Sequence, residues 1–321
     1  MGKKIGMTLT ALAMLVLILD AKTAQSGALA GIGLCIRSVI PSLFPLFVLS
    51  GLLTSGLSGS RLRLLRPVCR LVGIPEGGET LLAVGFLGGY PMGAQCVSQL
   101  YQQRQISEKC AKRLLMFCSN AGPAFLFGIA APQFSSPWAG WALLGIQLLS
   151  ALLVGLLLPG KEAEPVKPPE TSASLPEAVN RSVAVMARIC GWVVLFRILL
   201  AFLEAWLPIS GTAGVVISGL LELTVGCCNL QKIPQEGLRF VAAAGLLSFG
   251  GLCVWLQTAS VTGPLGTKSY ILGKLLQMFL AVALALLLVN PTGQIPVVMA
   301  LAAILLREAK KRGGNMASVG V

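Results

Sequence analysis

Apolar runs of membrane-crossing length recur along this chain, and they restrict its fold more than any other feature. Residues 143–158 read LLGIQLLSALLVGLLL, with no charged side chain. About 20 such residues in an α-helix cross a hydrocarbon core of about 30 Å. Several other runs approach this length. We therefore expect an all-α polytopic membrane protein.

The composition agrees with this class and excludes others. Only 12% of the 321 residues are charged, whereas a soluble domain has about 25%. The net charge is +13, and the basic residues lie in short loops without interleaved aromatic residues. This placement is typical of the positive-inside bias of membrane proteins and gives no indication of a nucleic-acid partner.

Catalytic chemistry has little support in the sequence. Histidine is absent, which removes the commonest metal ligand and proton shuttle. No paired carboxylates, nucleophile motif or phosphate-binding loop is present. We expect no enzyme activity, no cofactor and no metal site.

We expect about eight transmembrane helices and two re-entrant hairpins, with an internal two-fold repeat. The expected spans are 6–24, 31–57, 113–131, 138–158, 183–207, 211–229, 269–290 and 292–307.

The chain divides into two membrane halves, 1–159 and 183–307. A hydrophilic cytoplasmic linker, 160–182, joins them, and a basic tail, 308–321, follows the second half.

The stretch GFLGGYPMGAQ, residues 85–95, breaks an apolar run with four glycines and a proline. These are the poorest helix formers, and irregular backbone at membrane depth persists only beside protein or a water-filled cavity. Both flanks, 61–70 and 104–113, are strongly basic, which places them on one side. This pattern predicts a hairpin near 79–102 with Gly88, Gly89, Pro91 and Gly93 at its tip. A glycine-lined crossing helix is the alternative.

A second glycine pair predicts the second hairpin. Gly88 and Gly89 are followed after five residues by Gln95, and Gly250 and Gly251 are followed after five residues by Gln257. LSGLLTSG (49–56) and ISGLLELT (217–224) precede the two pairs. The pattern predicts a repeat, and a second hairpin near 238–260.

Two further sites carry polar groups inside apolar segments. FCSNAGPAF, residues 117–125, predicts an unwound helix with Ser119 and Asn120 facing a cavity; an ordinary proline kink is the alternative. Glu222 is an intramembrane carboxylate and a candidate coupling-ion or proton site. Lys274 lies near a span end, where its side chain is expected to reach the interface.

GYPMGA (89–94), followed by ISEKCAKRLLMFCSNAGPAF (106–125), resembles the YlbJ/SpoVV family of sporulation integral membrane proteins. The resemblance covers roughly 30–290. It implies gate or nucleoside-recognition domains and a distant similarity to concentrative nucleoside transporters, which have two re-entrant hairpins and two unwound helices. It also implies movement of dipicolinic acid during spore formation, in a cell membrane that would be the outer forespore membrane.

The resulting hypothesis is a secondary transporter of a small organic anion that works by alternating access across the lipid bilayer. Glu222 would hold the coupling ion, Na⁺ or H⁺, and an oligomer is compatible with the sequence. The expected substrate-binding residues are Gly88, Gly89, Gln95, Ser119, Asn120, Gly250, Gly251 and Gln257.

Two alternatives stay open: a nucleoside-type transporter and a non-transporting sporulation scaffold. Gln95 and Gln257 replace the acidic residue of a nucleoside site, which favours an anion. The eight-span count places both hairpins on the cytoplasmic side, whereas the resemblance implies opposite sides.

Overall fold

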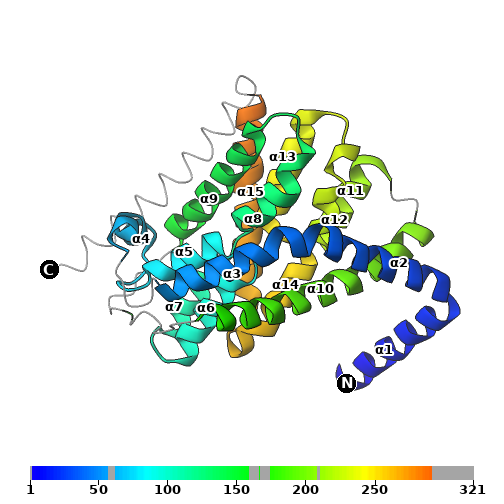
Figure 1. Cartoon of the computed structure of the whole chain (residues 1–321), viewed down its shortest axis with the longest axis horizontal. Coiled ribbons are helices and arrows are strands. Elements are labelled where there is room, and N and C mark those ends of the chain that lie inside the picture. Colours follow the sequence, from blue (N-terminus) through cyan, green and yellow to red (C-terminus); the bar gives the residue numbers. More distant parts are fainter. Residues whose placement is uncertain (1, 57–61, 159–165, 167–173, 208–209, 291–321) are drawn as a thin grey trace.

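A computed structural model describes residues 2–56, 62–158, 166, 174–207 and 210–290. Every regular element in these residues is a helix, as expected for the all-α class (Figure 1). The expected span 292–307 and the tail 308–321 lie outside the described residues.

The described part of the first half contains nine α-helices before the linker. They are α1 (Gly2–Leu19), α2 (Ala21–Leu34), α3 (Ile40–Gly56), α4 (Arg66–Val72), α5 (Glu79–Leu87), α6 (Met92–Gln102), α7 (Glu108–Leu115), α8 (Pro123–Phe125) and α9 (Trp138–Leu157). Two π-helical segments connect neighbouring helices, Cys35–Val39 and Leu126–Ala130.

The described second half contains six α-helices. They are α10 (Leu175–Trp206), α11 (Gly211–Leu221), α12 (Leu223–Cys228), α13 (Glu236–Phe249), α14 (Gly251–Thr262) and α15 (Lys268–Val289). The linker is shorter than expected, because Ser174 and Glu177 form a capping box that starts α10 inside it.

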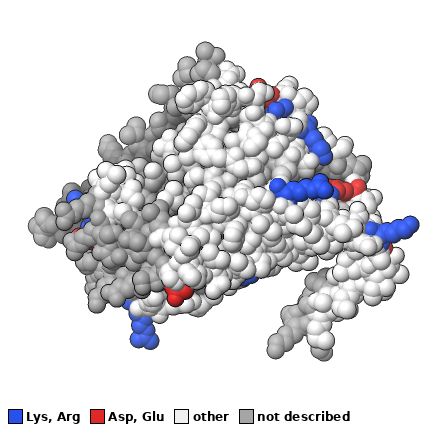
Figure 2. Space-filling view, viewed as in Figure 1, with Lys and Arg blue, Asp and Glu red and all other residues white. Residues whose placement is uncertain are grey.

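Five helical stretches of the described chain are long and apolar enough to cross a membrane. They are Ala21–Leu49, Trp138–Leu157, Leu175–Trp206, Glu236–Leu265 and Lys268–Val289. Charged side chains lie mainly toward two ends of the face in Figure 2, with a broad uncharged area between them. These features support a polytopic membrane protein, and the number of spans stays a prediction.

Two helix groups cross each other in Figure 1. In one, α9, α13 and α15 pack side by side. In the other, α10 packs along α2 and α3, and its contact with α2 is the most extensive between the described elements. Gly27 and Gly31 of α2 permit this approach, because a Cβ on either would lie 2.8 Å from a backbone Cα of α10. Small residues four apart commonly form such contacts in membrane helices.

Helices α5 and α6 form the first hairpin, at the expected position 79–102. With nine and eleven residues, they are about 14 and 17 Å long, roughly half of a hydrocarbon core. They pack against each other, and Gly85 and Gly93 both lie against the carbonyl group of Cys118. At the base, Arg113 of α7 donates a 3.0 Å hydrogen bond to the carbonyl of Gly73, just after α4. The two basic flanks therefore meet on one side.

The second hairpin is α11–α12, and the expectation of a hairpin near 238–260 is wrong. The chain reverses at Glu222, so that Gly219 and Gly226 lie in backbone contact. By contrast, α13 and α14 follow each other as one interrupted stretch within Glu236–Leu265. Gly250 and Gly251, with φ of +85° and +82°, interrupt that stretch without reversing it.

With α11–α12 as the second hairpin, the side on which that hairpin lies and the correspondence between the two halves both differ from the expectation. The two hairpins lie on opposite sides of the molecule in Figure 1, in contrast to the single side required by the span count. In each half a long helix, a hairpin, an interrupted helix and another long helix follow in order. The two glycine pairs do not correspond in this order, since Gly88–Gly89 lie at a hairpin tip and Gly250–Gly251 in an interrupted helix.

Gly31→Ala is expected to destabilise the fold, because its Cβ would meet the Cα of Val194 in α10. Overpacking of this kind costs about 1–3 kcal/mol. Thermal unfolding of the purified protein in detergent would measure it. Gly33→Ala is the matched control, since no atom lies within 4 Å of its Cβ, and it should be neutral or slightly stabilising. Equal melting temperatures for the two variants would contradict the packing assigned to Gly31.

Candidate functional site

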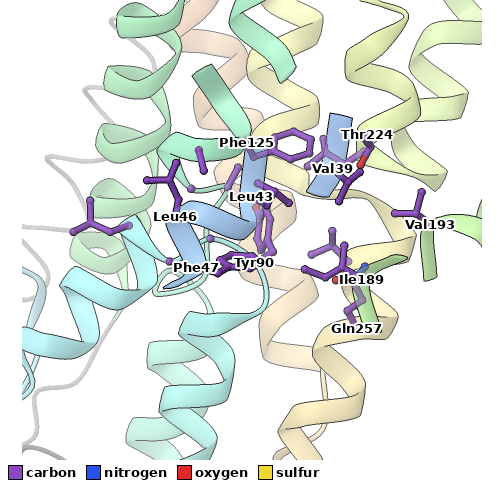
Figure 3. A pocket seen from close by; sticks show the side chains of 18 of the residues that line it. Val39, Leu43, Leu46, Phe47, Tyr90, Phe125, Ile189, Val193, Thr224 and Gln257 are labelled. Carbon is purple, nitrogen blue, oxygen red and sulfur yellow. The ribbon is translucent and has the colours of Figure 1, made fainter. Parts of the chain in front are cut away.

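One central cavity lies where the two hairpin tips meet. Gly88, Gly89 and Tyr90 contribute from the α5–α6 tip, and Glu222, Leu223 and Thr224 contribute from the α11–α12 tip. The other walls come from α3, α10, α14 and the chain around α8. Figure 3 labels Val39, Leu43, Leu46, Phe47, Tyr90, Phe125, Ile189, Val193, Thr224 and Gln257 among its lining side chains.

The unwound segment after α7 supports the first tip. The helix ends at Leu115 and resumes at Pro123, as the FCSNAGPAF pattern predicts. Gly122 lies so close to Gly89 that a Cβ on Gly122 would be 3.0 Å from the Gly89 Cα. The tip of the hairpin and the break in the neighbouring helix are therefore held together by backbone contact.

The cavity is narrow and mostly apolar. Its volume is about 50 Å³, enough for a few water molecules and well below the 300–1,000 Å³ typical of ligand pockets. Polar side chains are few: Glu222, Thr224 and Gln257. The carboxylate of Glu222 accepts a 2.7 Å hydrogen bond from the Val225 N–H and so caps α12.

Four of the expected site residues line this cavity: Gly88, Gly89, Glu222 and Gln257. Gln95 lines an adjoining cavity, which shares Gln257 and Ile189 with the central one.

Gly250 and Gly251 do not line the cavity but lie against residues of the two hairpins. A Cβ on Gly250 would be 3.1 Å from Cζ of Tyr90, and one on Gly251 would be 3.0 Å from the Gly219 carbonyl oxygen. They allow α13–α14 to approach both hairpins.

Ser119 and Asn120 do not face the cavity, contrary to expectation. Both are fully buried. Asn120 Oδ1 accepts hydrogen bonds from Lys274 Nζ at 3.0 Å and from Gln277 Nε2 at 2.9 Å. Lys274 also donates to Gln277 Oε1 at 2.6 Å. The unwound segment therefore turns its amide toward α15, away from the cavity.

These groups belong to a buried polar cluster that joins α9, α13, α15 and the unwound segment. Ser248 donates to Gln147 Oε1 at 2.9 Å, and Gln277 donates to the Gln147 carbonyl at 3.3 Å. We define the buried polar cluster as Asn120, Gln147, Ser150, Ser248, Lys274 and Gln277.

The expectation that Lys274 reaches the interface is wrong, because its side chain is only 1% exposed. A useful signal was present in the sequence: Lys274 and Gln277 are three apart, and so share one face of an otherwise apolar helix. Gln147 is likewise a lone amide in an apolar run.

Comparison with known proteins agrees with a membrane protein. Sporulation integral membrane protein YlbJ of Bacillus subtilis (strain 168) is 27% identical over 311 residues, which cover 81% of this chain and 76% of the relative. This similarity supports assignment of the chain to the YlbJ family. No protein-family model matches the chain, and no solved structure matches it either. The relative's name supports a membrane location and a connection with sporulation for the YlbJ family.

Asn120→Ala is expected to destabilise the protein, because it leaves the Lys274 ammonium and the Gln277 amide each without one buried partner. Removing a hydrogen bond to a buried charged group costs about 2–3 kcal/mol. Thermal unfolding in detergent would measure the loss. Asn180→Ala, at an exposed position of α10, is the control and should leave the melting temperature unchanged. A stable Asn120→Ala protein would contradict the structural role of the cluster.

Proposed function

We propose that this protein is a secondary transporter of a small organic anion, with the central cavity as its substrate site. The observation that carries the proposal is the convergence of two hairpin tips and an unwound helix on one cavity. Short helices and unwound backbone at membrane depth are typical of transporter sites near the bilayer midplane.

The two hairpins provide a route for alternating access. Both α5–α6 and α11–α12 are re-entrant in this proposal, and they enter from opposite sides. Beyond the α11–α12 tip lies a second cavity of about 520 Å³, lined in part by Arg197, Ser218 and Asn229. The central cavity, about 50 Å³, is too small for an aromatic dicarboxylate. In this proposal it is therefore a closed form, and movement of a hairpin admits the substrate.

Dipicolinic acid is the proposed substrate, in accord with the family resemblance, and the outer forespore membrane is the proposed location. Aliphatic and aromatic walls at Leu43, Phe47 and Phe125 suit a planar ring. The amide of Gln257 supplies a hydrogen-bond donor for a carboxylate. A nucleoside has fewer suitable partners, since Glu222 caps α12 and is assigned to the coupling ion in this proposal.

Gln257→Ala should abolish uptake of labelled dipicolinate into proteoliposomes, because it removes the amide from the cavity wall. Gln95→Ala, in the adjoining cavity, should reduce uptake more weakly. Gln99→Ala is the control, as Gln99 is an exposed amide on the same helix as Gln95. Uridine uptake in place of dipicolinate would favour the nucleoside alternative. Folded wild-type protein that moves neither compound would favour the scaffold.

Glu222→Gln should uncouple transport from its driving ion. The variant amide oxygen still accepts from the Val225 N–H, so α12 stays capped, while the negative charge is lost. Uptake driven by an imposed Na⁺ or proton gradient should fall to the level without a gradient. Equilibrium exchange of substrate serves as the control for folding and should persist. Full gradient dependence in the variant would show that the coupling ion binds elsewhere.

A further inference from the structure

The proposed substrate raises an electrostatic problem at the central cavity. Neither Lys nor Arg is among its described lining residues, and the one ionisable carboxyl group there, Glu222, has the same sign as the substrate. An anion in an apolar cavity needs an opposite charge close by. A cationic side chain directly behind the cavity wall would supply that charge.

Lys274 lies behind that wall. Its ammonium is 5.1 Å from the ring centroid of Tyr90, and the Tyr90 side chain lines the cavity (Figure 3). The Tyr90 hydroxyl donates a 3.1 Å hydrogen bond to the Leu247 carbonyl. The Tyr90 ring, whose hydroxyl donates to the Leu247 and Ser248 carbonyls of α13, thus lies beside the ammonium and also lines the cavity.

The charge of Lys274 is not neutralised by a carboxylate in the described part of the chain. The salt bridges there involve Arg66, Lys112 and Arg197. The partners of Lys274 are instead the amide oxygens of Asn120 and Gln277 and the rings of Tyr90 and Tyr270. Neutral partners solvate the ammonium without cancelling its field.

We propose that Lys274, protonated when the anion is bound, supplies the positive charge that selects an anion in the central cavity. This inference rests on the proposed function. In the closed form the field of Lys274 reaches the cavity past the Tyr90 ring. When the α5–α6 tip moves, Tyr90 moves with it and exposes the ammonium to the cavity. The ligand class is a small mono- or dicarboxylate whose apolar body fits the aliphatic and aromatic walls.

The test compares a charged ligand with its neutral counterpart. Binding of pyridine-2,6-dicarboxylate and of pyridine-2,6-dicarboxamide to the purified full-length protein would be measured by calorimetry. Lys274→Met should weaken dicarboxylate binding by roughly tenfold or more, the effect of one unit charge across about 10 Å at an effective dielectric constant of about 20. Binding of the diamide should not weaken.

Two controls separate Lys274 from other cations. Lys268→Met removes an exposed charge from the same helix and should leave both affinities unchanged. Arg188→Gln removes the cation of the adjoining cavity, the nearest rival for the role. Should Lys274→Met fail to fold, Lys274→Gln tests the same point, because its amide can still donate to Asn120.

The outcomes distinguish this inference from the proposed function. Tenfold loss confined to Lys274 variants and to the charged ligand supports both. If Lys274→Met or Lys274→Gln binds the dicarboxylate as tightly as the wild type, the inference is overturned and the proposed function stands. The same holds if the affinity is lost in Arg188→Gln instead. Folded wild-type protein that binds no carboxylate, or that does not prefer it to the diamide, overturns both.

Discussion

The fold depends on close backbone contact at the places where helices are interrupted. Non-helical backbone in an apolar environment has to find its partners within the protein. Gly85 and Gly93 bring the α5–α6 hairpin onto the Cys118 carbonyl, and Gly122 lies against Gly89. A side chain at any of these positions would separate the hairpin from the unwound segment. The same contacts position Gly88, Gly89 and Tyr90 at the central cavity.

The second half solves the same problem with different residues. Gly219 and Gly226 close the α11–α12 hairpin, and Glu222 caps the short helix after the reversal. A carboxylate at the tip therefore has a structural task in addition to the coupling role proposed for it. Two hairpins from opposite sides then meet at one cavity, an arrangement that a transporter needs if each side is to open in turn.

The buried polar side chains near the centre of the molecule are divided between the central cavity and the neighbouring buried polar cluster. The cavity has few polar side chains, whereas the buried polar cluster concentrates amides, hydroxyls and one ammonium. Tyr90 lines the cavity and contacts the cluster, with hydrogen bonds to the Leu247 and Ser248 carbonyls of α13 and a cation–π contact to Lys274. Movement of the first hairpin would thus alter both the access to the cavity and the surroundings of the buried charge.

The sequence by itself determined the membrane class, the first hairpin and the break at FCSNAGPAF, because apolar length and runs of glycine and proline act locally on the backbone. It also identified Glu222 and Gln257, two of the residues that line the central cavity. Only the tertiary structure decided that the chain reverses at Glu222 and continues past Gly250. Both segments contain glycine, and the choice depends on which neighbours they pack against. The tertiary structure likewise decided that Asn120 turns toward Lys274. The sequence pattern indicates that Asn120 lies in the middle of an apolar segment, but it does not indicate which residue of another helix is its partner.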